Sequence, residues 1–226
     1  SHAPQSRAEA PLSREDVPRF CWQNNPPAIA ITDTNNLFGA LEFSLKMTSY
    51  GIQPIIGIQM NISQNGKDDK DTGEVVLLAK NEIGYKNLLF LTNSFSSNEN
   101  YEKFINGIEL EKHSDGLLLL TGGIDNGFLG KPASLNNIKL VKERLKYLKN
   151  IFNDNLYVEL QRHGIKSQLM AEKILIDLAS EYDLPLVATN DCFFQNQKKF
   201  ESHQVLTCID KGLTISSDKS RILTKE

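Results

Sequence analysis

Short apolar runs recur along the chain, each bounded by turn residues, and they constrain the fold more than any other feature. They predict strands at 28–32, 55–62, 75–79, 116–121, 156–160 and 184–189. Nearly continuous apolarity over five to eight residues is typical of strands that are buried on both faces, as in a parallel sheet. We therefore expect most of these strands to lie side by side in one buried sheet.

Segments with helical period lie between most of the strands. The clearest is 140–152, where apolar residues recur on one face and lysines, Glu143 and Arg144 lie on the other. A second helix is predicted over 169–182, before Pro185. Strands that alternate with helices form βαβ units with right-handed crossovers. A barrel and an open doubly wound sheet both fit this α/β pattern.

Two segments depart from the alternation. The polar run 64–73 joins two strands directly and is too short for a crossover helix, so we expect an antiparallel hairpin with a mobile tip. The first twenty residues carry prolines at positions 4, 11 and 18, which interrupt any strand or long helix. We therefore set 1–20 apart and assign 21–226 to one domain, a size that α/β barrels commonly have.

Composition excludes several classes of protein. The chain has 25 Lys and Arg against 28 Asp and Glu, a net charge of -3, which disfavours tight autonomous binding to duplex DNA. It has 3 cysteines, too few and too scattered for a disulfide framework, which indicates a reducing compartment such as the cytoplasm. No apolar stretch reaches the roughly 18 residues that a membrane span needs, so we expect neither a membrane nor secretion.

Six ordered blocks of sequence point to a known family. The first reads Pro-Ala-Ile-Ala-Ile-Thr-Asp-Thr-Asn-Asn-Leu-Phe-Gly over 27–39, and the others occupy 51–57, 77–88, 116–123, 157–164 and 185–191. Together they resemble the PHP (polymerase and histidinol phosphatase) domain of bacterial DNA polymerase III alpha subunits. The resemblance implies a distorted TIM-like (β/α)7 barrel. The His-x-His pair that the family carries on its first strand is not found, which leaves open whether that strand is present.

Four candidate ligands fall at or just after predicted strand ends: Asp33, Glu159, His163 and Asp191. In βα barrels the functional side chains gather at the carboxyl ends of the strands. We therefore expect these four to converge on one rim. By resemblance, this is where active PHP enzymes bind metal ions and activate a water against a phosphoester.

The family's ligand pattern is broken at four other positions. Thr34 stands where active members have histidine, Gln59 where glutamate is usual, and Glu74 and Phe193 where histidines are usual. Threonine and glutamine are weak neutral ligands and phenylalanine is none. We therefore predict a vestigial site without catalytic residues and without a metal cofactor, held as a hydrogen-bonded polar rim. A residual Zn, Mn or Mg ion, or a phosphate site, is the alternative.

Other candidates have plainer explanations. The glycine-rich run 122–132 fails the P-loop pattern, and we expect a flexible loop there. Cys192 is interpreted as a semi-buried thiol more readily than as a nucleophile, and His203 as a core-edge residue of a helix over 200–210. His113 lies in a charged run and is predicted to be at the surface.

Three functional hypotheses remain. The resemblance favours a noncatalytic scaffold domain of a DNA-directed DNA polymerase in DNA replication, whose nucleotidyltransferase site lies in another domain. It implies the rest of the alpha subunit and the proofreading exonuclease subunit as partners, with DNA bound only through the full polymerase. A metal-dependent PHP phosphoesterase is the second hypothesis. An unrelated α/β binding module is the third, and the six blocks make it the weakest.

Overall fold

The structure is a computed structural model that describes residues 26–64, 72–96, 104–162 and 166–190, together with positions 205, 208, 209 and 214. The chain forms two compact units. The larger unit comprises 30–44 and 54–189, and the smaller comprises 1–29, 45–53 and 190–226. The sheet core and the helices that cover it belong to the larger unit.

The described elements confirm the predicted alternation and extend it. The strands are β1 (Ala28–Thr34), β2 (Gln53–Ser63), β3 (Thr72–Ala79), β4 (Ile105–Asn106), β5 (Leu117–Leu120), β6 (Leu156–Leu160) and β7 (Leu186–Ala188). The helices are α3 (Ala40–Ser49), α4 (Glu82–Ser96), α5 (Gly107–Lys112), α6 (Gly130–Ser134), α7 (Ile138–Phe152) and α8 (Lys166–Glu181), with a 3-10 turn, η2, at Asn153–Asn155. All six predicted strands are present. The short β4 was not predicted.

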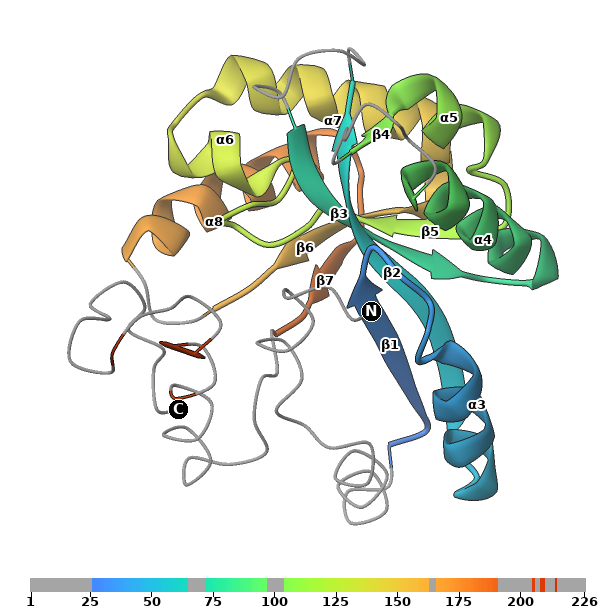
Figure 1. Cartoon of the computed structure of the whole chain (residues 1–226). Coiled ribbons are helices and arrows are strands. Elements are labelled where there is room, and N and C mark those ends of the chain that lie inside the picture. Colours follow the sequence, from blue (N-terminus) through green and yellow to red (C-terminus); the bar gives the residue numbers. More distant parts are fainter. Residues whose placement is uncertain are drawn as a thin grey trace. The chain divides into compact units, whose positions relative to one another are not determined.

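The strands form one sheet in the order β1-β2-β3-β5-β6-β7, with β4 paired to β2. β3 is antiparallel to β2, which confirms the predicted hairpin. It is also antiparallel to β5, where the alternation of strands and helices had predicted a parallel crossover, whereas β5, β6 and β7 are parallel as expected. The tip of the hairpin lies outside the described residues. The sheet curls, and α4 to α8 lie along one side of it (Figure 1). The predicted α/β class with a curled, barrel-like sheet is therefore confirmed.

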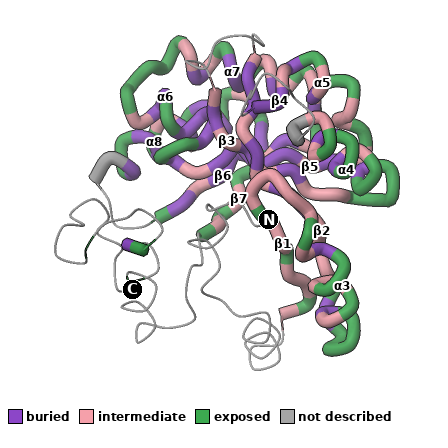
Figure 2. Tube along the Cα trace, viewed as in Figure 1, coloured by how far each residue is buried: buried purple, intermediate pink, exposed green. Residues whose placement is uncertain are grey.

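The two faces of the sheet have different chemistry. On β2, Ile58, Met60 and Ile62 are fully buried in the hydrophobic core, together with Val75 and Leu77 of β3. Residues two apart on a strand share a face, so the intervening residues, Gln59 among them, point to the opposite face. Figure 2 shows the buried residues concentrated on β2, β3, β5 and β6 and on the helices that cover them. Polar side chains are thereby confined to the other face.

Helix α7 confirms the predicted periodicity but corrects one residue. Asn137 caps it, because its Oδ1 accepts a hydrogen bond from the Leu140 N–H at 3.2 Å. Arg144, which we expected on the solvated basic face, is buried at 3% exposure. Its Nη1 donates to the Phe128 carbonyl at 2.8 Å and its guanidinium lies 4.4 Å from the centroid of the Phe128 ring. A buried arginine can occupy this position because a carbonyl and an aromatic face both contact it.

The segment after β5 is not the flexible loop that its glycines predicted. The Glu74 N–H donates to the Asn126 carbonyl at 2.9 Å, and the Phe128 N–H donates back to the Glu74 carbonyl at 2.9 Å. Ile124 and Phe128 are fully buried. The glycines permit this close packing, since a Cβ on Gly127 would lie 1.9 Å from a backbone oxygen. The segment is therefore a packed part of the core.

His113 is also more than a surface residue. It is half-buried, its ring is stacked on Phe90 with centroids 3.7 Å apart, and its Nδ1 lies 3.2 Å from Asn87 Oδ1. The stack explains why an imidazole sits in this otherwise charged run. Cys192 and His203 lie outside the described residues. Within the described part of the chain, no helix is both long and apolar enough to cross a membrane.

Candidate functional site at the sheet rim

Two glutamates lie level with each other on the polar face of the sheet. Val76 of β3 pairs with Leu120 of β5, and Leu120 pairs with Tyr157 of β6. The rim is the edge of the sheet where β3 begins and where β5 and β6 end. The residues two positions nearer to it, Glu74 on β3 and Glu159 on β6, point to the same face as Val76 and Tyr157. This register aligns Glu74 with Glu159, with β5 between them. The rim therefore presents two carboxylates on the side of the sheet opposite the hydrophobic core.

Glu159 is the centre of a buried hydrogen-bond network. Its side chain is 3% exposed. Its Oε2 accepts from the Gly122 N–H at 3.0 Å, and its Oε1 accepts from Gln161 Nε2 at 3.1 Å and from the Thr189 hydroxyl. The Glu159 N–H donates to Thr121 Oγ1 at 3.0 Å. Donors are thus directed at both oxygens of the carboxylate, which satisfies the hydrogen-bonding capacity that burial would otherwise leave unmet. The network joins the ends of β5, β6 and β7.

The local backbone explains how one of these donors reaches the carboxylate. Gly122 has φ +80, a left-handed conformation that glycine adopts without steric cost. A Cβ at this position would lie 2.2 Å from the Glu74 carbonyl oxygen, so only glycine fits. The turn directs the Gly122 N–H to Glu159. The same residue therefore lies against both rim glutamates.

Glu74 has a different set of contacts. Its Oε2 accepts from Gln59 Nε2 at 3.0 Å, in a pair that is only partly buried. The Gln59 carbonyl accepts from the Asn35 N–H at 2.9 Å, which extends the pairing of β1 with β2. Asn35 has φ 58, and its buried Oδ1 has no hydrogen-bond partner among the described residues. This side of the rim therefore differs from the Glu159 side in two respects: its glutamate is only partly buried, and one buried amide oxygen nearby lacks a hydrogen bond among the described residues.

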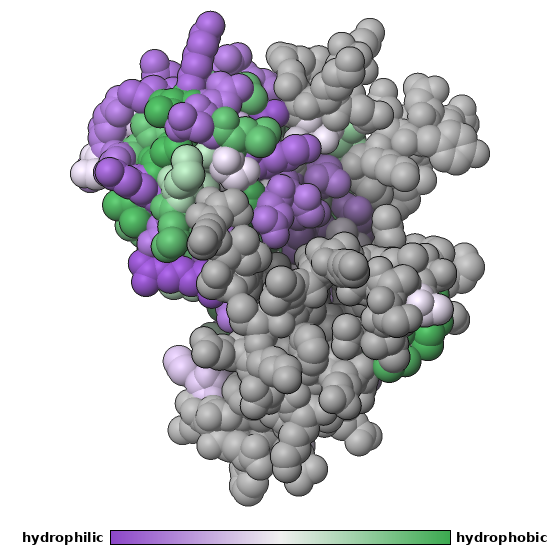
Figure 3. All heavy atoms as spheres, turned by 90° about the vertical axis from the view of Figure 1, so that its left-hand side faces the viewer, coloured by the Kyte–Doolittle hydropathy of each residue, from purple (hydrophilic) through white to green (hydrophobic). Residues whose placement is uncertain are grey.

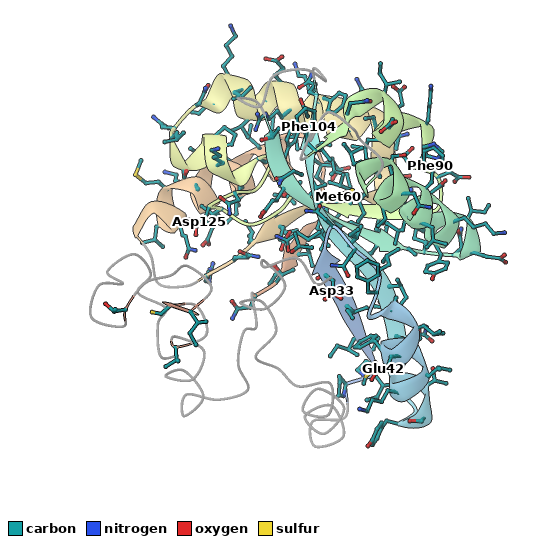
Figure 4. All side chains as sticks on the ribbon, viewed as in Figure 1. Asp33, Glu42, Met60, Phe90, Phe104 and Asp125 are labelled. Carbon is teal, nitrogen blue, oxygen red and sulfur yellow. The ribbon has the colours of Figure 1, made fainter. Side chains whose placement is uncertain are left out.

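Asp33 and Thr34 occupy the end of β1 next to this pair. Asp33 is exposed, and one carboxylate oxygen lies beside Gly39, where an added Cβ would be 3.1 Å away (Figure 4). The Thr34 carbonyl accepts from Asn36 Nδ2 at 2.9 Å, and Asn36 Oδ1 accepts from the Phe38 N–H at 3.2 Å. These bonds form an Asx turn. The turn fixes the backbone that follows Asp33.

An ion pair ties the end of β6 to the helical layer. Arg162 donates from Nη2 to Glu172 Oε1 at 2.5 Å, and its Nε lies 3.2 and 3.1 Å from the two carboxylate oxygens. The arginine is 77% exposed and the glutamate 11%. The hydrogen bond from Arg162 holds the pKa of Glu172 below its usual range, against the opposing effect of burial. The two residues that follow β6 therefore have different partners: the side chain of Gln161 contacts Glu159 at the rim, and that of Arg162 contacts Glu172 of α8.

The structure places the predicted site residues in two groups. Glu159 lies in the network of β5, β6 and β7, and Asp33, Thr34, Gln59 and Glu74 lie on β1, β2 and β3. The other predicted positions, 163, 191 and 193, lie outside the described residues, so the convergence of all four candidate ligands stays a prediction.

Sequence reasoning missed three members of the Glu159 network. Thr121, Gln161 and Thr189 all donate to or accept from Glu159. They are uncharged, and a search for metal ligands passes over such residues. Their position in the sequence could have identified them, because each is the last residue of a predicted strand or the residue directly after it.

The described residues do not fit the metal cluster that active PHP enzymes hold. Within 26–64, 72–96, 104–162 and 166–190, no group of three or more His, Cys, Asp or Glu side chains is arranged to hold a metal ion. The amides of Gln59 and Gln161 donate to Glu74 and Glu159, so N–H groups contact the oxygens that a cation would approach. We therefore derive no chemical step through a metal.

Comparison with known proteins places the chain in a family. The family model of the PHP domain matches residues 1–163, a range that includes the first twenty. DNA polymerase III subunit alpha of Caulobacter vibrioides is 34% identical over 227 residues, which cover 98% of this chain. The same subunit of Rickettsia bellii is 36% identical over 210 residues, which cover 90% of this chain. The matched regions are 20% and 17% of the lengths of these relatives, so the chain spans about a fifth of their length.

A solved structure from Bifidobacterium adolescentis, of a candidate metal-dependent phosphoesterase, overlays with a TM-score of 0.48 and 11% identity, covering 86% of this chain and 83% of that one. We base no conclusion on a likeness of that size. The family match covers well over half of the chain and spans both sides of the rim up to β6. The chain therefore belongs to the PHP domain family.

Proposed function

We propose that this chain is the N-terminal PHP domain of a DNA polymerase III alpha subunit and serves there as a noncatalytic scaffold in DNA replication. Two alpha subunits match it over 90% or more of its length. On this proposal the DNA-directed DNA polymerase, a nucleotidyltransferase, carries its active site in other domains. The rest of the alpha subunit and the proofreading exonuclease subunit are the partners, and the cytoplasm is the compartment.

The single observation that carries the scaffold role is the hydrogen bonding of Glu159. Its two oxygens accept from a backbone N–H, an amide and a hydroxyl, each from a different strand end. A general base or metal ligand needs a lone pair directed at substrate or cation. Here the described lone pairs are directed at protein donors, which suits a residue that holds strands together.

A phosphoesterase remains the second candidate because Asp33 is exposed on the same rim. Phosphatase assays on a generic aryl phosphate with added zinc or manganese distinguish the two functions. We expect no turnover above the buffer rate from the wild type. Metal-dependent turnover that is lost in Asp191→Ala, with unfolding in urea unchanged, would establish the phosphoesterase instead.

A primer-extension assay tests the assignment of polymerase chemistry to other domains. The purified chain is expected to incorporate no nucleotides, because on this proposal the carboxylates that hold the two magnesium ions of nucleotidyl transfer lie in another domain. Incorporation by material free of contaminating polymerase would refute this. The intact mass of the native polypeptide that contains this sequence provides an independent check, since an alpha subunit would be about five times as long.

A further inference from the structure

An exposed apolar surface lies where α6, the start of α7 and the first turns of α8 meet. Its large side chains are Leu135, Ile138, Leu169 and Met170, which are 74%, 43%, 69% and 58% exposed. Figure 3 shows this side of the larger unit, with hydrophobic side chains gathered among hydrophilic ones. We call these four residues the α6–α8 surface. Soluble proteins seldom leave several large apolar side chains together in water unless the surface binds something.

The α6–α8 surface rests on a packed base. On α8 the residues at positions 168, 171, 172 and 175 are buried, so 169 and 170 project from the opposite side of the helix. On α6 Pro132 and Ala133 are buried, and the Asn137 N–H donates to the Pro132 carbonyl at 2.9 Å. These contacts fix the turn that carries Leu135 and Ile138. The apolar side chains are therefore held outward by the fold.

Charged residues border the surface. Lys131 lies one helical turn before Leu135, Lys139 follows Ile138, and Lys173 lies one turn after Leu169, and all three lysines are exposed. The nearest carboxylate on α8, Glu172, is already paired with Arg162. The surface thus has an apolar centre with lysines at its edge. It fits a partner face that is apolar with carboxylates around it.

We propose that the α6–α8 surface packs against the remainder of the alpha-subunit polypeptide, an inference that rests on the proposed function. Relatives carry about four fifths of their length outside the matched region. A covalently linked domain is present at high effective concentration, so a modest surface is enough to hold it. Interfaces between domains of one chain are also more polar than obligate subunit interfaces, in keeping with the lysine border.

The chain contains its own probe for this interface. It has 3 methionines. Met170 is 58% exposed on the α6–α8 surface, whereas Met47 and Met60 are each 1% exposed and serve as internal controls. Peroxide converts exposed methionine to the sulfoxide, and peptide mass spectrometry measures the rate at each position.

The experiment compares this chain alone with the native polypeptide that contains it. Met170 is expected to oxidise readily in the chain alone and at least about tenfold more slowly in the native polypeptide, because docking removes peroxide access. Leu135→Lys in the native polypeptide should restore its oxidation. Ile83→Lys, a matched change at a 52% exposed position on α4, should leave Met170 protected. Met47 and Met60 should stay unoxidised throughout.

Several outcomes would overturn the proposal. Equal oxidation of Met170 in a longer native polypeptide would refute the interface alone and leave the proposed function standing. Protection already present in the chain alone would mean that its own residues, or a second copy, cover the surface. A native polypeptide no longer than this chain would refute the proposed function and the interface with it.

Discussion

The two halves of the sheet rim hold their carboxylates by different means. In the β5–β7 half, formed by the ends of β5, β6 and β7, Glu159 is 3% exposed and accepts from donors on three segments. In the β1–β3 half, formed by β1, β2 and β3, Glu74 accepts from Gln59 in a partly buried pair, and Asn35 Oδ1 has no partner among the described residues. One half is a closed polar network and the other is partly open.

The difference shows two ways in which a fold can hold a carboxylate at the edge of a sheet. A buried carboxylate is costly unless hydrogen bonds satisfy it. In the β5–β7 half Gln161, Thr189 and the Gly122 N–H meet that requirement. In the β1–β3 half the carboxylates retain contact with solvent and need fewer donors. Stability should therefore depend on the two halves unequally, and any residual ligand chemistry should lie in the β1–β3 half.

The largest expected effect comes from removing each glutamate in turn. Glu159→Ala removes the acceptor shared by the buried Gly122 N–H, the Gln161 amide and the partly buried Thr189 hydroxyl, and is expected to cost about 3 kcal/mol of unfolding free energy. Glu74→Ala is the matched change in the β1–β3 half and should cost about 1 kcal/mol, because its partner is partly exposed to water. Urea unfolding followed by circular dichroism measures both. Equal losses would mean that the two halves do not differ in the way described.

Glycine substitutions sharpen the same comparison at the backbone. Gly122→Ala combines a left-handed φ with a Cβ 2.2 Å from the Glu74 carbonyl oxygen, so we expect a loss of about 3 kcal/mol. Gly51→Ala is the control, since its φ is +72 but a Cβ there would meet nothing within 4 Å. It should cost about 1 kcal/mol. Similar midpoints in urea for the two variants would show that the close approach at Gly122 carries no energetic weight.

Acid dependence tests the ion pair beside the β5–β7 half. The pKa of Glu172 is lowered by its hydrogen bond from Arg162. A group with a lowered folded-state pKa contributes stability above its unfolded value, near 4.5, and loses that contribution as pH falls through the lowered value. Glu172→Gln should therefore flatten the fall of the urea midpoint below about pH 5. Superimposable acid profiles for wild type and variant would contradict this assignment.

The smallest effect is expected at Asn35. Asn35→Gly removes a buried oxygen that lacks a partner and keeps the positive φ of 58 accessible, but it adds flexibility to the unfolded chain. Loss of the unpaired oxygen stabilises the folded state, whereas the added flexibility stabilises the unfolded state. The unfolding free energy should therefore change by no more than about 0.5 kcal/mol. Thermal unfolding measures the change. A loss comparable to that of Glu159→Ala would mean that Asn35 belongs to a closed network after all.

Several features of the fold and one residue of the site could be predicted from the sequence. The hairpin between β2 and β3 followed from a linker too short for a helix, and α7 from its apolar period. Glu159 was identified because it lies near the end of a predicted strand, within a block that resembles the family. Such local patterns are sufficient to predict a structural feature when that feature depends on a single segment of the chain.

Other features depend on contacts between distant segments. Arg144 has the charge of a surface residue, and only the Phe128 carbonyl and ring, on another segment, explain its burial. The glycine-rich run is packed because the backbone of Glu74, on the neighbouring strand β3, hydrogen-bonds to it. Thr121 and Thr189 join Glu159 from 38 and 30 residues away. No local pattern encodes such contacts, because register and closure of the sheet create them.

The most direct test of the central claim is elemental analysis of the purified, untagged chain after dialysis against zinc and manganese. Hydrogen bonding of the rim carboxylates by protein donors predicts far less than one metal ion per chain, with no difference between wild type and Asp191→Ala. One or more ions per chain, lost in Asp191→Ala, would contradict the account and show that the rim still holds a metal site.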